Sequence, residues 1–248
     1  MKMIMAAVAS CMLAFAVAGT SEAQSVLKVG STTSGQPTSG LNPQTKQWEG
    51  VAVEVLMAAA KNAGLQIEFQ PMSFAELQPA LLDKKIDVIA SGYGPTPARE
   101  KVVDFTKPFW SFRDLLVVPV GDAKLYKSPA DFKDMSIATP RGSSYVNGLK
   151  EAGANLTLVA TPPEGLSELE AGHVAGVVDN GLQLAYRLRG DAHPGLKIVA
   201  SYSPFQEGKL AFAVQKGNTE LLAKLDASLA KLQADGTVES IAARWGLK

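Results

Sequence analysis

The sequence predicts an α/β protein built from two doubly wound sheets. Short β-like runs alternate with helical runs, and the whole alternation occurs twice along the chain. In addition, "IDVIA" (86–90) and "VAGVVD" (174–179) are continuous apolar runs, which are typical of parallel strands covered by helices on both faces. Two α/β units of similar build are therefore expected side by side.

The first unit carries local signals for its helix ends as well as for its strands. Gly64 follows a helical run and suits the position just beyond a helix C-terminus, because glycine adopts left-handed backbone without steric cost. Ser73 and Glu76 have the spacing of a capping box at a helix start. The predicted order is a strand (26–31), a helix (51–64), a strand (65–72), a helix (74–85) and a strand (86–90).

The second unit begins after a long extended stretch, residues 111–120. Ser128 and Thr161 each precede a proline, which is the arrangement of an N-cap followed by proline at the first helical position. The predicted order is a helix from 129, a strand (136–140), a helix (143–153), a strand (156–161), a helix (162–172), a strand (174–179), a helix (182–190), strands (196–202 and 209–215) and two closing helices (218–236 and 237–246).

Residues 1–23 read as a secretory signal peptide. An apolar run precedes small residues at Ser21 and Ala23, where a signal peptidase would cut before Gln24. Lipidation at Cys11 is disfavoured, because the apolar run continues well past it. Cys11 is the only cysteine, so the secreted protein is expected to have neither a disulfide nor thiol chemistry.

Composition and spacing exclude several function classes. The 24 basic residues equal the 24 acidic ones, whereas nucleic-acid binders carry a basic footprint. His173 and His193 lie without a matching cluster of cysteines or carboxylates, so no metal site is expected. "GYGPTPAR" lacks the spacing of a phosphate loop, and "GSS" lacks the pattern of a nucleophile elbow. We therefore expect no cofactor, no metal and no catalytic residue.

The two apolar strands point to a ligand cleft. In open α/β sheets, ligands gather at the carboxyl ends of strands, where "SGYGPTPAR" (91–99) and "VVDN" (177–180) both lie. Arg99 on one lip and Asp179 on the other would suit a zwitterion. A guanidinium matches a carboxylate with two parallel hydrogen bonds. Ser143 and Ser144 open a predicted helix, whose backbone N–H groups would face an anion.

Two motifs identify the chain as similar to a known family. "TPAREKVVDFTKPF" and the C-terminal "KLQADGTVESIAARW" together resemble the extracytoplasmic solute-binding proteins of family 3, the amino-acid receptors of ABC importers. The resemblance covers nearly all of the chain after the signal peptide. It implies a two-lobed periplasmic-binding-protein type II fold with hinge strands near 110–116 and 209–214. Lobe 1 would comprise 24–110 plus 212–248, and lobe 2 would comprise 111–211.

The resemblance also implies a ligand site. The arginine after "TP" would grip the ligand α-carboxylate, the aspartate ending the second-lobe strand would bind the α-ammonium, and small residues after a second-lobe glycine would supply hydroxyl and N–H contacts. An aromatic or apolar residue would wall the pocket, and the position two residues before the "TP" threonine, usually Ser or Thr, would contact the ligand; a glycine there can still donate its backbone N–H. These positions are Arg99, Asp179, Gly142 with Ser143 and Ser144, Phe74 and Gly94.

Several positions depart from the family pattern. Gly35, Thr38 and Gly40 stand where aromatic residues are usual, and Gly94 replaces a usual Ser or Thr. Losing that hydroxyl would cost roughly 0.5–1.5 kcal/mol of net hydrogen bonding. The pocket should therefore be wider, or be filled from elsewhere.

We expect the filling to come from another aromatic side chain, with Tyr93, Trp48 and Tyr145 as the candidates. Arg141 lies just before the second-lobe glycine and is a candidate partner for a second acid group on the ligand.

Each candidate also has an ordinary structural interpretation. For Arg141 the structural interpretation is favoured, and for the others the ligand role is at least as strong. The alternatives are a surface ion pair of Arg99 with Glu100 or Asp104, a helix cap for Asp179, Ser143 or Ser144, a core position for Phe74 and a solvated loop position for Arg141.

Three function classes follow, and the sequence favours the first. It is a periplasmic receptor, expected to be a monomer, that binds a small zwitterionic or carboxylate solute by hinge closure and delivers it to an ABC permease. The second is a lyase similar to cyclohexadienyl dehydratases, which needs an acid over the ring; Glu164, Glu168 and Glu207 have no obvious placement for this. The third is a sensor module of a membrane kinase, which the lack of a later transmembrane segment disfavours.

Overall fold

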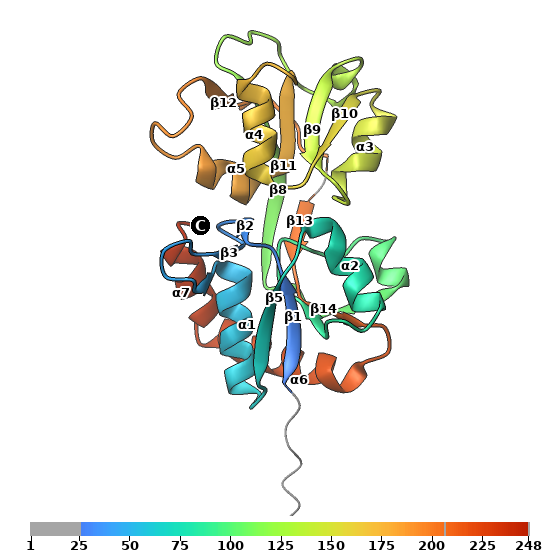
Figure 1. The fold of residues 1–248 in the computed structure, drawn as a ribbon, viewed down its shortest axis with the longest axis vertical. Coiled ribbons are helices and arrows are strands. Elements are labelled where there is room, and N and C mark those ends of the chain that lie inside the picture. Colours follow the sequence, from blue (N-terminus) through green and yellow to red (C-terminus); the bar gives the residue numbers. More distant parts are fainter. Residues whose placement is uncertain (1–25, 206, 248) are drawn as a thin grey trace, which may run out of the picture.

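The computed structural model describes residues 26–205 and 207–247. The predicted signal peptide, 1–23, lies outside the described residues. The described chain forms two α/β lobes, one above the other in Figure 1, and the predicted α/β class is confirmed. In the described part, no helix has the length and apolar character needed to cross a membrane.

The lower lobe in Figure 1 is built on a mixed sheet. The strand β1 pairs in parallel with β5 and β6, whereas β14 is antiparallel to both of its neighbours, β6 and β7. The antiparallel strand arises because the chain returns to this lobe after building the other one. The order across the sheet is β5 (Ile67–Pro71), β1 (Leu27–Ser31), β6 (Val88–Ile89), β14 (Ala213–Gln215) and β7 (Val103–Phe105).

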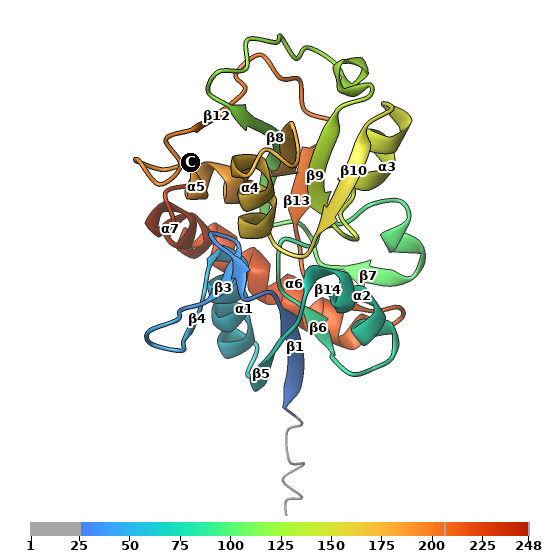
Figure 2. The same cartoon turned by 45° about the horizontal axis from the view of Figure 1, so that its top comes forward.

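The upper lobe repeats this plan. Its strands β9, β10 and β11 are parallel, and the long strand β8 lies antiparallel to β11 and β12. The order is β10 (Asn155–Val159), β9 (Ser136–Pro140), β11 (Gly176–Asn180), β8 (Trp110–Pro119) and β12 (Leu196–Ile198). Because β11 runs antiparallel to β8, which rises from the lower lobe, the polar end of β11 faces the lower lobe, as the cleft prediction requires. Figure 2 shows the neighbouring strands β9 and β10 above α2 (Phe74–Leu82) of the lower lobe.

Two strands run between the lobes. The first half of β8 pairs antiparallel with β13 (Glu207–Leu210), and its second half joins the upper sheet. The predicted single strand 209–215 is wrong, because β13 and β14 are separate strands. The break occurs where the chain changes partner, and there Phe212 N donates to Thr106 Oγ1 at 3.0 Å. The lobe bounds 24–110 with 212–248 and 111–211 stay a prediction.

The helices begin and end largely where the local signals indicate. Glu76 Oε2 accepts from Ser73 N at 2.9 Å, Thr161 caps its helix, and Gly64 has a φ of +68°. The run after Ser128 forms only a short 3-10 helix. The helices are α1 (Val51–Asn62), α2 (Phe74–Leu82), α3 (Tyr145–Glu151), α4 (Pro162–Glu170), α5 (Gly181–Arg187), α6 (Thr219–Ala234) and α7 (Thr237–Arg244).

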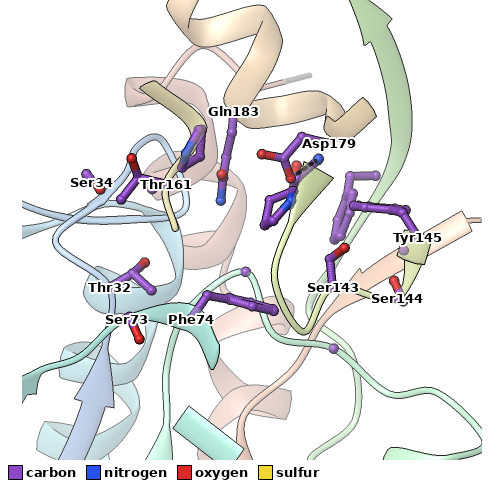
Figure 3. A pocket seen from close by; sticks show the side chains of 18 of the residues that line it. Thr32, Ser34, Ser73, Phe74, Ser143, Ser144, Tyr145, Thr161, Asp179 and Gln183 are labelled. Atoms are coloured by element: carbon purple, nitrogen blue, oxygen red, sulfur yellow. Dashed lines mark hydrogen bonds between the residues drawn. The ribbon is translucent and has the colours of Figure 1, made fainter. Parts of the chain in front are cut away.

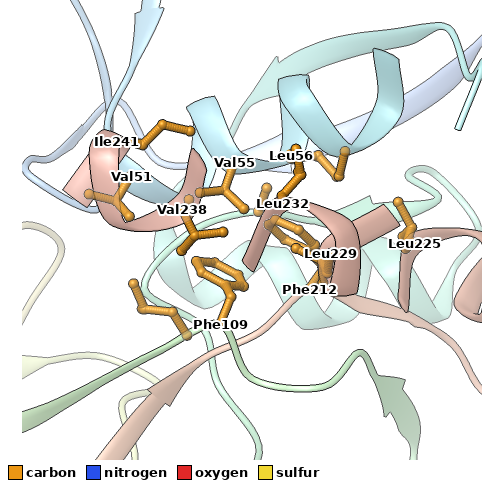
Figure 4. Close-up of a cluster of buried hydrophobic side chains, with 14 of the residues drawn as sticks. Val51, Val55, Leu56, Phe109, Phe212, Leu225, Leu229, Leu232, Val238 and Ile241 are labelled. Carbon is orange, nitrogen blue, oxygen red and sulfur yellow. The ribbon is translucent and has the colours of Figure 1, made fainter. Parts of the chain in front are cut away.

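A hydrophobic core under the lower sheet anchors both connecting strands. Helices α1, α6 and α7 pack together there (Figure 4), so the C-terminal helices belong to the first lobe. Phe109 precedes β8, Phe212 follows β13, and their ring centroids lie 4.9 Å apart within this core. Because each ring is buried, the lower ends of both strands are held to one lobe.

A small sheet that the sequence did not reveal borders the cleft. Its strands are β2 (Ser34–Gly35), β3 (Ser39–Leu41) and β4 (Trp48–Glu49), in that order. This sheet holds the segment between β1 and α1, residues 32–50, which we call the first loop, against the start of α1. There Ala52 N donates to Thr38 O at 2.9 Å.

Candidate functional site

A cavity of about 370 Å³ lies between the lobes and is lined by both of them (Figure 3). Its size is within the usual range for small-molecule sites. We call it the inter-lobe cavity. The structure brings to it all six predicted site residues: Phe74, Gly94, Arg99, Ser143, Ser144 and Asp179.

Arg99 is a buried cation on the lower side of the cavity. It begins a 3-10 turn (Arg99–Lys101) and is only 9% exposed. Its Nη1 donates to Gly94 O at 2.9 Å, and its Nη2 donates to Gly142 O of the other lobe at 3.1 Å. The Cζ atom lies 4.0 Å from the Tyr93 ring centroid, a cation–π contact.

The surface ion pair considered for Arg99 is wrong. Asp104 accepts instead from Lys216 Nζ at 2.6 Å and from Gly217 N at 2.8 Å. Burial lowers the pKa of Arg99, but arginine has so high an ordinary pKa that the guanidinium stays charged. A guanidinium has five N–H groups, so the two contacts above leave donors for a ligand.

Gly94 is a glycine because the hinge strand passes directly over it. A Cβ atom built on Gly94 would lie 1.9 Å from Lys209 O of β13. A Ser or Thr at this position would therefore collide with the backbone of β13. The hydroxyl that is missing from the family pattern is thus excluded by packing, and the Gly94 carbonyl instead orients Arg99.

We predict that Gly94→Ala lowers the free energy of unfolding by about 1–3 kcal/mol, because the added methyl overpacks a backbone contact. This corresponds to a melting temperature lower by roughly 3–10 °C. Gly121→Ala is the matched control, since no atom lies within 4 Å of its added Cβ. Equal melting temperatures for the two variants would contradict the close packing at Gly94.

Asp179 is a buried carboxylate on the upper side of the cavity. It lies near the end of β11 and is 4% exposed. Its Oδ1 accepts from Asn180 N at 2.6 Å, whereas Oδ2 has no hydrogen-bond partner among the described residues. Burial raises the pKa of Asp179 to about 7, against the lowering effect of the Asn180 N–H and of Arg187. Arg187 thus partly offsets the buried charge, but the Oδ2 oxygen still lacks a donor within the described chain.

The helix cap considered for Asp179 belongs to its neighbour. Asn180 Oδ1 accepts from Leu182 N at 2.9 Å and caps α5. The Asn180 Nδ2 group is buried, lines the cavity and has no partner within the described part of the chain. The sequence analysis placed "VVDN" (177–180) at the end of a strand but did not select Asn180 as a site residue. A polar side chain directly after a buried strand was the signal that could have identified it.

The loop between β9 and α3, residues 141–144, lines the cavity through its two serines, but one of the predicted backbone N–H donors is already used. Ser143 N donates to Pro140 O at 3.1 Å, so this N–H is not available to an anion. Ser144 precedes the seven-residue helix α3, and Tyr145, its first residue, also lines the cavity. Phe74 contributes an aromatic wall from the start of α2, with its ring centroid 5.6 Å from Arg99 Cζ.

The place of the missing aromatic residues is taken by polar side chains of the other lobe. Gln183 Nε2 donates to Thr38 Oγ1 at 2.9 Å, and Arg187 Nη2 donates to Ser34 O. A Cβ on Gly35 would lie 3.2 Å from Gln183 Nε2. The first loop therefore leaves space that α5 fills, a pairing of residues far apart in the sequence.

Of the three aromatic residues expected to fill the pocket, one lines the cavity and two do not. Tyr145 lines the cavity. Trp48 instead stacks on Phe69 with ring centroids 5.2 Å apart, and Tyr93 lies under Arg99 without lining the cavity. Trp48 is held away because β4 pairs with β3 and directs its ring onto β5.

Of the four other charged residues considered from the sequence, one lines the cavity and three do not. Arg141 is exposed, does not line the cavity, and its Nη2 donates to Leu158 O at 3.4 Å. Glu164 and Glu168 also lie outside the cavity lining, whereas the exposed Glu207 on β13 is part of it. Among the residues that the structure describes, no group of three His, Cys, Asp or Glu is placed to hold a metal ion.

Comparison with known proteins agrees with this architecture. The profile of the bacterial extracellular solute-binding proteins, family 3, matches residues 27–248. A probable amino-acid ABC transporter-binding protein of Haemophilus influenzae is 29% identical over 79% of this chain and 75% of its own.

Solved structures are similar along most of the chain. An ancestral arginine-binding protein bound to arginine superposes with a TM-score of 0.81 and 30% identity, covering 89% of this chain and 97% of its own. An ancestral amino acid-binding protein, described as a precursor of cyclohexadienyl dehydratase, gives 0.79 and 28% over 89% and 95%. The predicted type II periplasmic-binding-protein fold is thus confirmed, and the chain belongs to the bacterial extracellular solute-binding proteins, family 3.

Proposed function

We propose that this protein is a periplasmic receptor that binds a small amino acid for an ABC importer. One observation carries the proposal: a buried guanidinium and a buried, unpartnered carboxylate oxygen, contributed by different lobes, line the same cavity. An α-amino acid carries one carboxylate and one ammonium, which complement these two groups. Arg99 would receive the carboxylate, and Asp179 the ammonium.

The described cavity supports capture by closure. A ligand favours a closed arrangement only through contacts with both lobes, and Arg99 and Asp179 stand on opposite sides. Direct bonds already cross the cleft, from Arg99 to Gly142 O and from Gln183 to Thr38. The first of these already has a charged donor, and the ligand would add two further charge-assisted links. Release to a permease would reverse the hinge motion about β8 and β13.

We propose that no bond is made or broken in the cavity. The lyase alternative needs an acid over a cyclohexadienyl ring, and of its three candidate glutamates only Glu207 lines the described cavity. Glu207 is exposed on β13, the strand that covers Gly94, and is not enclosed in the cavity. Incubation with prephenate or arogenate should therefore yield no aromatic product; product formation that Glu207→Gln abolishes would instead support the lyase.

We predict that a thermal-shift panel of the common L-amino acids contains a stabilising ligand. A ligand at one hundred times its dissociation constant adds about 2.7 kcal/mol of stability. For a chain of this size, that raises the melting temperature by roughly 5–11 °C. The matching amino-acid amide, which lacks the carboxylate, is the control and should give a much smaller shift. A panel without any shift would count against amino-acid binding.

A further inference from the structure

The lining residues at one end of the inter-lobe cavity are polar and uncharged; Arg187, whose Nη2 donates to Ser34 O, does not line the cavity. In Figure 3, Thr32, Ser34, Thr161 and Gln183 lie on one side, and Ser143, Ser144 and Tyr145 lie on the other. Asp179 and Phe74 stand between the two groups. If an amino acid places its carboxylate at Arg99 and its ammonium at Asp179, its side chain meets the threonine and glutamine end. We call this the distal end.

The remaining charged side chains that line the cavity are exposed to water. Besides Arg99 and Asp179, the acidic and basic lining residues of the described chain are Glu76, Glu207 and Lys209. Glu207 and Lys209 are exposed neighbours on one face of β13, the strand that covers Gly94. Glu76 is exposed, and its Oε2 accepts from Ser73 N at 2.9 Å and from Ser73 Oγ at 2.7 Å. None of these offers a buried counter-charge to a ligand side chain.

Asn180 instead offers a buried, unused donor. Its orientation follows from the cap, because Oδ1 accepts from Leu182 N and the amide Nδ2 must then point the other way. Nδ2 has no partner in the described part of the chain. Gly92 keeps the space in front of it open, since a Cβ there would lie 3.4 Å from Asn180 Nδ2 and 3.1 Å from Gln183 Nε2.

The wall next to these amides is made of hydroxyl groups. Thr32 Oγ1 lies 2.6 Å from Ser39 Oγ and 3.0 Å from Ser91 Oγ, which are themselves 3.0 Å apart. This closed triangle of hydroxyls is neutral and largely buried. An ionised ligand side chain placed against it would lose its hydration without gaining a counter-charge, which is strongly unfavourable.

We propose that the distal end selects an amino acid whose side chain is uncharged and ends in a carbonyl oxygen, as a carboxamide does. Asn180 Nδ2 would donate to that oxygen, and the hydroxyls of Thr32 and Thr161 would stand near the rest of the amide. This inference rests on the proposed function, because it takes the carboxylate and ammonium sites as occupied. It separates this protein from the arginine-bound relative described above.

Calorimetric titration of the full secreted chain tests the inference. Glutamine or asparagine should bind at least ~30-fold more tightly than arginine, lysine or glutamate, and more tightly than leucine. Arginine or leucine binding as tightly as the carboxamides would overturn the inference while leaving amino-acid binding intact. Failure of every amino acid to bind would reject the proposed function itself, and the inference with it.

Two variants probe the distal end directly. Asn180→Ser keeps a good N-cap residue but removes the amide donor, so the ratio of carboxamide affinity to alanine affinity should fall about threefold to tenfold. Thr32→Asp places a carboxylate where Ser39 and Ser91 can donate to it, and arginine affinity should rise at least tenfold. Thr32→Asn is its uncharged control and should show no such gain. An unchanged ratio in Asn180→Ser, or no gain in Thr32→Asp, would refute the assigned orientation.

Discussion

Replacing Arg99 by alanine is expected to weaken amino-acid binding by about two to three orders of magnitude. The variant loses two charge-assisted hydrogen bonds to the ligand carboxylate, each worth about 1.5–3 kcal/mol. The lower part of their summed range, about 3–4 kcal/mol, is expected because water partly replaces the lost donors, and it corresponds to a factor of ~10²–10³ in the dissociation constant. Titration calorimetry of wild type and variant with the best ligand of the panel measures this factor.

Arg99→Lys is the control for charge alone. Lysine keeps a positive group but lacks the planar fork that reaches Gly94 O and Gly142 O in two directions. Its affinity should fall between those of wild type and Arg99→Ala, with a loss of about tenfold or more. If Arg99→Ala binds within threefold of wild type, the carboxylate site lies elsewhere.

The architecture was accessible from the sequence because its signals are local. The capping pair Ser73 and Glu76, the Thr161 cap and the glycine after α1 each act within one helical turn, and all three are present as predicted. The apolar runs of β6 and β11 also indicated which strand ends meet at a cleft, and the family motifs then pointed to the six candidate residues, all of which line one cavity.

What sequence reasoning missed depends on contacts between distant segments. Gln183 donates to Thr38 across the cleft, 145 residues away, so neither residue alone indicates that the first loop is filled from α5. From the sequence, Gly94 was interpreted as the loss of a ligand-binding hydroxyl. In the structure, glycine is required there because the carbonyl of Lys209 on β13 leaves no room for a side chain. The division of 209–215 into two strands likewise follows from a change of partner strand.

Ligand affinity should fall steeply as the pH decreases below 7. Burial raises the pKa of Asp179 to about 7 in the unliganded protein, and only the ionised carboxylate attracts an ammonium. The bound ammonium in turn lowers this pKa, so binding below pH 7 releases a proton. Affinity should then change about tenfold per pH unit, and binding at pH 5 should be ~50–100-fold weaker than at pH 8. Calorimetry in buffers of different ionisation enthalpy detects the released proton.

The variant Asp179→Asn tests whether the pH dependence of ligand affinity comes from Asp179 or from another group. This variant should bind the ligand weakly at every pH, and its affinity should not depend on pH between 5 and 8, because the new side chain can neither ionise nor neutralise the ligand ammonium. It should also be the more stable protein without ligand. A carboxyl whose pKa is raised on folding stabilises the fold when protonated, and that contribution is lost as pH rises from about 4 to 7.

The stability difference should therefore depend on pH in a defined direction. At pH 8 the unliganded wild type holds a buried charge that Arg187 offsets only in part and whose Oδ2 has no donor among the described residues. The free energy of unfolding of Asp179→Asn should therefore exceed that of the wild type by on the order of 3 kcal/mol. At pH 5 most of this difference should vanish, since the wild-type carboxyl is then protonated. Denaturant titration at both pH values measures it. A variant less stable than wild type at pH 8 would mean that Asp179 already has a compensating partner and is not held ready for the ligand.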